Sequence, residues 1–183
     1  GWLAVSGSPN TAARALLGKG GQWLIDPLNL DVIAGPSVDV SGPPVFTPTS
    51  TTGFLSVTDL LAALSSNSVV TLKTTGTVGA GTGLIRFQTM LDLGSMAGTH
   101  TLNVFSAGGI EINAAIKAST TGDALNLNLT AAGNVTIASG VEVLLNSGTF
   151  TSSGVDFSGG KLISAGGGGV WLNHTGDISL GSV

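Results

Sequence analysis

The stretch Leu125–Ile137 reads LNLNLTAAGNVTI, and it determines the predicted fold. Its leucines alternate with Asn and Thr, which is the two-residue period of a β-strand with one buried face. Ala131–Asn134 interrupts the run with small and turn-forming residues, and Val135–Ile137 resumes the alternation. We therefore predict a strand, a tight corner and a second strand.

Similar phrases recur along the chain, at Thr101–Ile112 (TLNVFSAGGIEI) and Val170–Leu180 (VWLNHTGDISL), with a weaker copy at Gly154–Gly159. The last apolar residues of the successive second strands are separated by steps of 25, 25, 20 and 23 residues. These residues are Phe87, Ile112, Ile137, Phe157 and Leu180. A drifting repeat of this length, built from short strands, indicates a solenoid.

The predicted fold class is all-β, a right-handed parallel β-helix with two or three short strands in each coil. We expect Ile112, Ile137, Phe157 and Leu180 to stack inward on consecutive coils. The handedness follows from the rule for parallel crossovers. The strands are too short and evenly spaced for an α/β fold. The hairpin dipeptides Asn-Gly and Asp-Gly are absent, which argues against an antiparallel sandwich.

Two segments are predicted to depart from the repeat. Residues 35–53 are rich in Pro, Ser and Thr and hold four of the six prolines, so we expect a loop outside the stack. Residues 58–66 are predicted to form a short helix, capped by Thr58 or Asp59. Neither end of the chain shows a charged or helical cap, so both terminal coils are predicted to be open. We expect residues 1–183 to be a single β-helix segment of a larger protein.

The composition fits a stack of strands. Gly accounts for 29 of 183 residues, only 9% are charged, and Ser, Thr and Asn fill the polar positions. Like charges on adjacent rungs would repel across one strand spacing, about 4.8 Å. The net charge is −4 and the six basic residues are scattered, so no nucleic-acid partner is predicted. The absence of Cys excludes disulfides and thiolate metal sites, and no apolar run is long enough to predict a membrane span.

Part of the sequence resembles a known family. Gly21–Leu30 (GQWLIDPLNL) resembles the G-x-W-L-[IL]-D-P-x-[ND]-[LIV] phrase of filamentous-haemagglutinin-like exoproteins. Gly1–Gly7 (GWLAVSG) resembles the G-F-V-E-V-S-G phrase that precedes it, with Trp2 and Ala4 as departures. The segment Phe54–Thr75, a short helix and then VVTLKTT, is similar to the next segment in proteins of that family. The family's N-terminal secretion motif is not visible here, so we expect this segment to lie after it.

The resemblance implies a right-handed parallel β-helix within a large secreted or cell-surface protein of a Gram-negative bacterium. Such proteins belong to two-partner secretion systems and are exported through a partner pore in the outer membrane. Many members serve as adhesins, and some carry a toxin at a distant C-terminus. A receptor on a host or neighbouring cell is therefore an expected partner, although the sequence does not name it.

Few residues suggest chemistry. His100 and His174 are single, with no His or Cys at metal-ligand spacing, and are predicted to be corner or surface residues. The acidic residues are dispersed, although a pair could converge across rungs, as in β-helical polysaccharide-cleaving enzymes. They are Asp26, Asp31, Asp39, Asp59, Asp92, Glu111, Asp123, Glu142, Asp156 and Asp177.

Gly166–Gly169 is predicted to form a tight corner or β-bulge, because no helix and no Lys-Ser/Thr pair comes after it as in a phosphate loop. The three tryptophans are predicted to be core or cap residues rather than a sugar-binding platform: Trp2, Trp23 and Trp171. We therefore assign no catalytic, cofactor-binding or metal-binding residue and expect no cofactor.

The function predicted from the sequence is that of a structural, non-catalytic rod segment of an adhesin or fibre, which mediates adhesion or self-association through its open ends. The first alternative is a glycan-binding or polysaccharide-cleaving β-helix, which requires an aromatic and acidic cleft. The second is an ice-binding solenoid, which requires a flat face of T-x-T rungs in register. Thr71, Thr74, Thr75 and Thr77 fit that pattern, but later rungs carry no regular Thr column.

Overall fold

The computed structural model describes residues 28–77, 79–94, 96–118, 122–160, 162–164 and 167–181. The phrase Gly1–Gly7 and most of the phrase Gly21–Leu30 lie outside the described residues, together with Trp2 and Trp23. The fold and the candidate site are therefore described from residue 28 onward.

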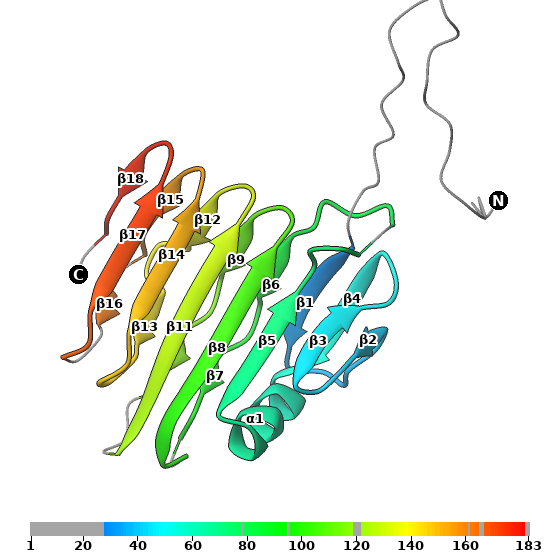
Figure 1. Cartoon of the computed structure of the whole chain (residues 1–183), viewed down its shortest axis with the longest axis horizontal. Helices are drawn as coiled ribbons and strands as arrows, with labels where there is room; N and C mark the ends of the chain where they lie inside the picture. The colour runs from blue at the N-terminus through cyan, green and yellow to red at the C-terminus, as the bar shows by residue number, and fades with distance from the viewer. Residues whose placement is uncertain are drawn as a thin grey trace, which may run out of the picture.

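The chain winds into a parallel β-solenoid of about six turns, in which three sheets form the walls (Figure 1). The first sheet consists, in spatial order, of β4 (Thr52–Ser56), β1 (Asn29–Ile33), β6 (Ile85–Phe87), β9 (Ile110–Ile112), β12 (Val135–Ile137), β15 (Phe157–Ser158) and β18 (Ile178–Ser179). The second sheet consists of β7 (Leu91–Asp92), β10 (Ile116–Lys117), β13 (Glu142–Leu144) and β16 (Leu162–Ser164). The third sheet consists of β2 (Val40–Ser41), β3 (Val45–Pro48), β5 (Val69–Lys73), β8 (Gly98–Ser106), β11 (Asp123–Ala131), β14 (Phe150–Gly154) and β17 (Val170–His174).

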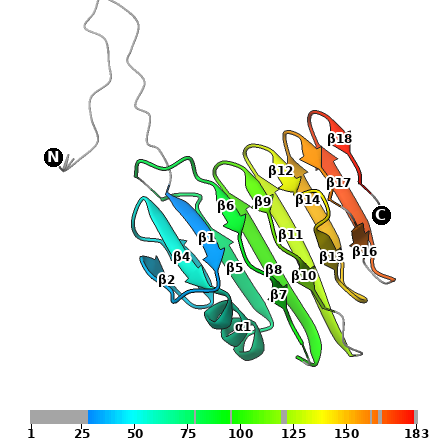
Figure 2. The ribbon, with the colours of Figure 1, turned by 180° about the vertical axis from the view of Figure 1, so that it is seen from behind.

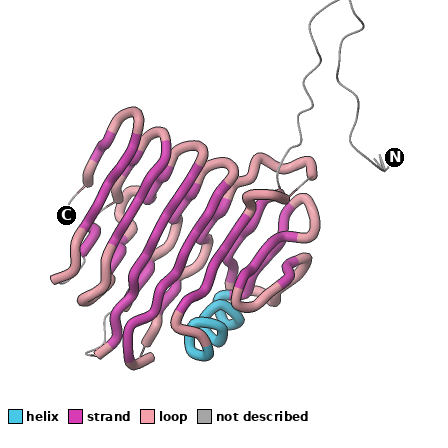
Figure 3. The backbone as a smooth tube through the Cα atoms, viewed as in Figure 1, coloured by secondary structure: helices cyan, strands magenta, loops and turns pink. Residues whose placement is uncertain are grey.

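The direction of the coil can be followed in Figures 1 and 3. Strands of the third sheet run upward at the front, and the chain crosses at the top to the first sheet behind. It then descends through the second sheet, while successive coils advance toward the C-terminal end on the left. This sense of rotation and advance makes the coil right-handed, as predicted.

The stretch that predicted the fold forms β11 and β12. Leu125, Leu127 and Leu129 point inward and are at most 1% exposed. The corner at Gly133 stacks on the equivalent corner of the preceding coil, and the N–H of Gly133 donates a hydrogen bond of 2.8 Å to the carbonyl of Gly108 there. Both strands pair in parallel with the preceding coil, so the corner is a crossover between sheets and not a hairpin.

The predicted inward column of Ile112, Ile137, Phe157 and Leu180 is correct for its first two residues. For the last two, the strand register differs from the prediction. Ile112 pairs with Ile137 on the next coil, as expected. Phe157, however, pairs with Val135 rather than with Ile137, and the next residue in that column is Ile178. The predicted Leu180 lies beyond β18 and is 48% exposed. The reason is that the later coils are shorter, so a count from strand ends loses the register.

The predicted helix is α1, Val57–Ser66, which follows β4 and precedes β5. It begins one residue earlier than expected, since the N-cap is Ser56 and not Thr58 or Asp59. The Ser56 hydroxyl accepts a hydrogen bond from the N–H of Thr58 over 3.2 Å. Leu60 and Leu64 are buried in the core. In later coils the second-sheet strand takes this place between the first and third sheets, so α1 completes the wall at the N-terminal end (Figure 2).

The Pro-rich segment at residues 35–53 follows β1 and includes the first two residues of β4, and it does not lie outside the stack as expected. It contains β2 and β3, and β3 pairs in parallel with β5 of the next coil. Phe46 of β3 is 5% exposed and belongs to the core. An isolated apolar pair between prolines is a weak strand signal, and only its distant partner in β5 makes it a strand.

The same insertion covers the N-terminal end of the solenoid. β2 pairs antiparallel with β3, and Val38 exchanges two backbone hydrogen bonds of 2.8 Å with Phe54 of β4. The outermost strands of both long sheets are thereby paired with a segment that runs the opposite way. The expectation of an open coil is therefore wrong for the N-terminal end of the described residues.

The tight corner predicted from the glycine run is confirmed for Gly167–Gly169, while Gly166 lies outside the described residues. Gly167 has a φ of +110°, a region that favours glycine. A Cβ at Gly168 would lie 1.9 Å from the carbonyl oxygen of Gly148 on the coil below. The corner therefore needs glycine for its close approach, and β17 starts directly after it.

Candidate functional site

The outer face of the third sheet carries two long columns made mostly of uncharged polar side chains. Because neighbouring strands are in register, every second residue of each strand points outward and aligns with its counterparts. The first, the Trp171 column, consists of Thr71, Asn103, Asn128, Thr151 and Trp171. The second, the Lys73 column, consists of Lys73, Phe105, Thr130, Ser153 and Asn173.

Hydrogen bonds between rungs hold these side chains in place. The amide of Asn128 donates to the side-chain oxygen of Asn103 over 3.0 Å. On the neighbouring column the side-chain oxygen of Asn126 accepts from both the N–H and the hydroxyl of Thr149, at 3.0 and 3.1 Å. The face is therefore an ordered array of amides and hydroxyls, with rungs about 4.8 Å apart.

Trp171 lies on this outer face, contrary to the expected core or cap position. It occupies the outward place in β17, paired with Thr151, and it is 56% exposed. Its six-membered ring lies over Gly169, since a Cβ there would meet three ring atoms at 2.1 to 2.6 Å. One side of the indole therefore covers the backbone at Gly169, and the other side of the indole faces solvent. The alternation Val170, Trp171, Leu172 already placed this tryptophan at a polar position.

The outward positions of the other two sheets carry several charged residues. On the first sheet the guanidinium of Arg86 donates two hydrogen bonds of 2.7 Å to the carboxylate of Asp31, and Glu111 follows on the next rung. The hydrogen bond with Asp31 and the nearby carboxylate charges raise the pKa of Arg86 further above its ordinary value, against the effect of desolvation. On the second sheet Lys117 stands opposite Asp92 in the strand register. In the third sheet, Lys73 is the single charged residue of the two columns.

Within the described residues no further coil stacks on the last one, which is called the open C-terminal coil below. β17 and β18 are the outermost described strands of their sheets. Inward residues of the preceding coil are covered, for example Phe150 and Phe157 at 0% and 1% exposure. Their counterparts on the last coil are not, since Ile178 is 46% exposed and Val170 is only partly buried. Apolar side chains and two unpaired strand edges thus meet at this end.

Two polar side chains, Ser152 and His174, contact each other inside the solenoid at the open coil. His174 points inward from β17, and its Nε2 lies 3.0 Å from the hydroxyl of Ser152, which is fully buried. The ring of His174 packs against that of Phe157, with centroids 5.4 Å apart. Desolvation lowers the pKa of His174 below its ordinary value, and the charge of Asp156 opposes this shift.

Both histidines were expected at corners or on the surface, and both instead point into the solenoid. His100 is 8% exposed and lies 3.3 Å through its Nε2 from the carbonyl oxygen of Ala97. The Nδ1 atoms of His100 and His174 are buried and have no hydrogen-bond partner among the described residues. The Ser152–His174 pair has the residue types of a Ser–His hydrolytic site. It cannot act as one, because the Ser152 hydroxyl is inaccessible to a substrate.

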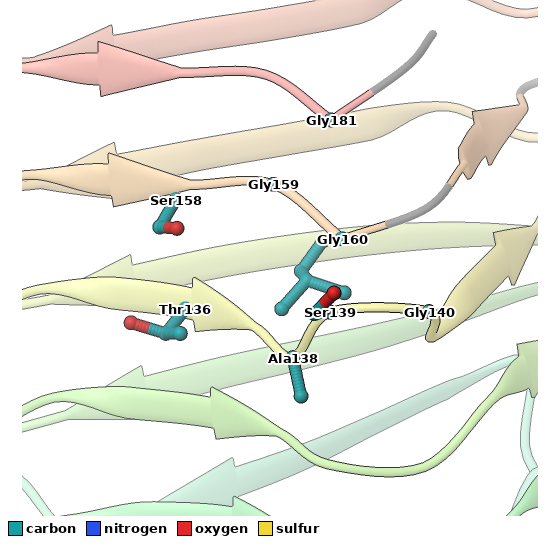
Figure 4. A pocket seen from close by; sticks show the side chains of 9 residues that line it. Thr136, Ala138, Ser139, Gly140, Ser158, Gly159, Gly160 and Gly181 are labelled. Carbon is teal, nitrogen blue, oxygen red and sulfur yellow. The ribbon is translucent and has the colours of Figure 1, made fainter.

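A shallow open hollow lies at the corner between the first and second sheets near the C-terminal end (Figure 4). Small residues and glycine backbone line it, and none of the described residues around it is titratable: Thr136, Ile137, Ala138, Ser139, Gly140, Ser158, Gly159, Gly160 and Gly181. It offers hydroxyl and peptide groups to a ligand but no acid, base or nucleophile activated by a neighbour.

The dispersed acidic residues do not form a metal cluster in the part of the chain that the structure describes, where no group of three or more His, Asp or Glu side chains converges. Asp156 has a structural contact, since its carboxylate accepts a hydrogen bond of 3.0 Å from the N–H of Asp177 on the next coil. No helix among the described residues is long and apolar enough to cross a membrane.

The fold and these surfaces define the chain as a parallel β-solenoid with an open terminal coil. Comparisons with protein-family models, with curated proteins and with solved structures found no match.

Proposed function

We propose that this chain is a structural, non-catalytic rod segment of a large secreted or cell-surface adhesin or fibre protein of a Gram-negative bacterium. The observation that carries the proposal is the open C-terminal coil, where Ile178 and Leu180 are 46% and 48% exposed beside two unpaired strands. A solenoid is extended by stacking one more coil on such an end. The phrase at Gly21–Leu30, similar to that of exoproteins exported through an outer-membrane pore, supports the same role.

The next coil can come from the parent protein or from a second molecule. In the parent protein a following coil would cover the apolar end and pair with β17 and β18. In the isolated chain the same edges are available to another copy. Because antiparallel pairing covers the first coil of the described residues, we expect two copies to join through their C-terminal coils. That contact is isologous and closes at a pair, so it does not lead to a filament.

Light scattering over a concentration series tests this proposal. We expect the isolated chain to shift from one copy to two as its concentration rises. Ile178→Lys should abolish the shift, because it places a charge among the exposed apolar side chains of the open coil. Val155→Lys is the matched control, since Val155 is 40% exposed at a corner on the side of the solenoid.

Two results would contradict the proposed function. A chain that stays monomeric at every concentration would mean that the terminal coil is satisfied within one molecule. Reproducible turnover of a polysaccharide that is lost on replacement of Asp156 would make the chain an enzyme, because the charge of this residue acts on the pKa of His174.

A further inference from the structure

We propose that the outer face of the third sheet is a docking surface for an uncharged, ribbon-like polysaccharide. The surface comprises the Trp171 column and the Lys73 column defined above. This inference rests on the proposed function, because it names the class of partner that such a rod would hold at a cell surface. It uses the long side of the solenoid, whereas self-association uses its end.

The distribution of charge argues for an uncharged partner. The first sheet carries Asp31, Arg86 and Glu111 on successive rungs, and Asp31 and Arg86 form an ion pair. The solenoid therefore tolerates charged rungs, and avoidance of like charges does not explain why the two columns of the third sheet hold only Lys73. A polyanion would require a row of basic residues along this face. A neutral chain of hydroxyl groups requires the amides and hydroxyls that are present.

The polar groups of the face are already ordered before any ligand binds. The Asn103–Asn128 hydrogen bond fixes two side chains of the Trp171 column, and Asn128 and Thr151 are half-buried. Little side-chain entropy remains to be lost on binding. A repeating array of donors and acceptors also fits a repeating ligand, since each rung can present its groups to a further sugar unit.

The exposed aromatic rings give the face a second property that a sugar recognises. Trp171 lies over Gly169 with one side free, and Phe105 is 38% exposed in the Lys73 column. An aromatic ring with an apolar face and polar neighbours suits the apolar face of a sugar ring, whose hydroxyl groups point sideways toward hydrogen-bonding partners. A flat sheet suits a polysaccharide that is itself extended and flat.

The same observations disfavour ice as the ligand. An ice face requires a regular lattice of similar side chains, and the Trp171 column mixes Thr with Asn and ends in an indole. Aromatic rings such as Phe105 and Trp171 would interrupt an ordered water layer. Ice remains useful as an outcome of the test, because ice and polysaccharide are measured in different ways.

Binding to cellulose and to chitin, as insoluble probes, tests the proposal. We expect the full chain to be depleted from solution by at least one of them. Trp171→Ala should weaken this binding about tenfold or more, as the loss of an exposed aromatic anchor does at other interfaces. A soluble cello-oligosaccharide or chito-oligosaccharide should also change the tryptophan fluorescence, and Trp171→Ala should remove that change even though Trp2 and Trp23 remain.

A matched pair of charge substitutions separates this face from the others. Thr151→Asp places a carboxylate in the Trp171 column, and Thr136→Asp places one on the outer side of the first sheet. Both threonines are half-buried and point outward from neighbouring coils. We expect Thr151→Asp to weaken binding about tenfold or more and Thr136→Asp to leave it within about twofold. Thermal melts of both variants verify that they are folded.

The outcomes are distinct. No binding to either probe, equal effects of the two Thr→Asp substitutions, or preferential binding to the polyanion heparin would each overturn the inference. Inhibition of ice growth without polysaccharide binding would overturn it as well and assign the face to ice. Loss of the inference leaves the proposed function intact if the light-scattering shift of the unmodified chain persists, because that shift depends on Ile178 and not on this face.

Discussion

At the scale of single residues, the direction of each side chain decides its role, and alternation predicts that direction within strands. Asn126 and Asn128 were predicted to face outward from the period of LNLNL, and they do. Trp171 follows the same rule but was assigned by its apolar character, which placed it wrongly in the core or cap. His174 also obeys alternation, since it lies two residues from Leu172 on the inward side. Residue type misled where position in the strand was informative.

His174 makes the terminal coil sensitive to pH. Its pKa is lowered in the folded chain, so its neutral form is favoured by folding, and protonation opposes the folded state. The contribution of neutral His174 to the stability of the folded chain is fully present above the ordinary pKa of 6.5. It is lost as the pH falls through the lower pKa of the folded chain. Ser152 and Phe157 face the ring, and Asp156 is the carboxylate whose charge reaches it.

We therefore expect β17 amides to exchange faster with solvent at about pH 5.5 than at about pH 7.5, after correction for the intrinsic pH dependence of exchange. His174→Gln should remove most of this difference, because Gln can still hydrogen-bond to the Ser152 hydroxyl but does not titrate. β5 lies on an earlier coil and contains no histidine, so its amides serve as an internal reference. An unchanged pH response in the Gln variant would exclude His174 as its source.

At the scale of elements, the strands with a strong local repeat were predictable and the strand that depends on a distant partner was not. β11 and β12 follow from the sequence because apolar and polar residues alternate over many positions. The N-terminal insertion holds a four-residue strand, β3, next to prolines, and its pairing with β5 cannot be read locally. The two columns on the outer face of the third sheet could not be predicted from local sequence either, because they depend on the register between coils of unequal length.

The contribution of β3 to the core can be measured with two neighbouring residues. Phe46 is 5% exposed, whereas Val45, next to it in the same strand, is 47% exposed. Phe46→Ala should lower the free energy of unfolding by about 3–5 kcal/mol, because it removes a buried ring and leaves a cavity. Val45→Ala should change it by less than about 0.5 kcal/mol. Equal melting temperatures for the two variants would mean that β3 is not part of the core and that the insertion is the loop predicted from the sequence.

At the scale of the whole molecule, the two ends of the solenoid differ. The N-terminal end is closed by α1 and by an antiparallel segment around β2, while the C-terminal end stops at exposed strands. Composition did not reveal this asymmetry, because neither end carries the charged residues that often mark a cap. The cap here consists of backbone pairing and of a helix whose buried side chains, Leu60 and Leu64, are ordinary core leucines.

The asymmetry predicts a gradient of local stability along the axis. Each coil contacts only its neighbours, so a coil covered on both sides is more stable than one covered on a single side. β8 and β11 share nine paired residues and lie between further coils. We expect their amides to exchange most slowly and those of β17 and β18 to exchange fastest. Hydrogen exchange read by mass spectrometry on peptides from each coil measures this gradient.

Concentration provides the control for that gradient. If two copies join through their terminal coils, raising the protein concentration should protect β17 and β18 and leave β8 and β11 unchanged, because only the terminal strands gain partners. Ile178→Lys should keep the gradient and abolish its dependence on concentration. Uniform protection from β5 to β18 at low concentration would contradict the expected gradient, because it would require the described chain to open as a single cooperative unit despite its uncovered end.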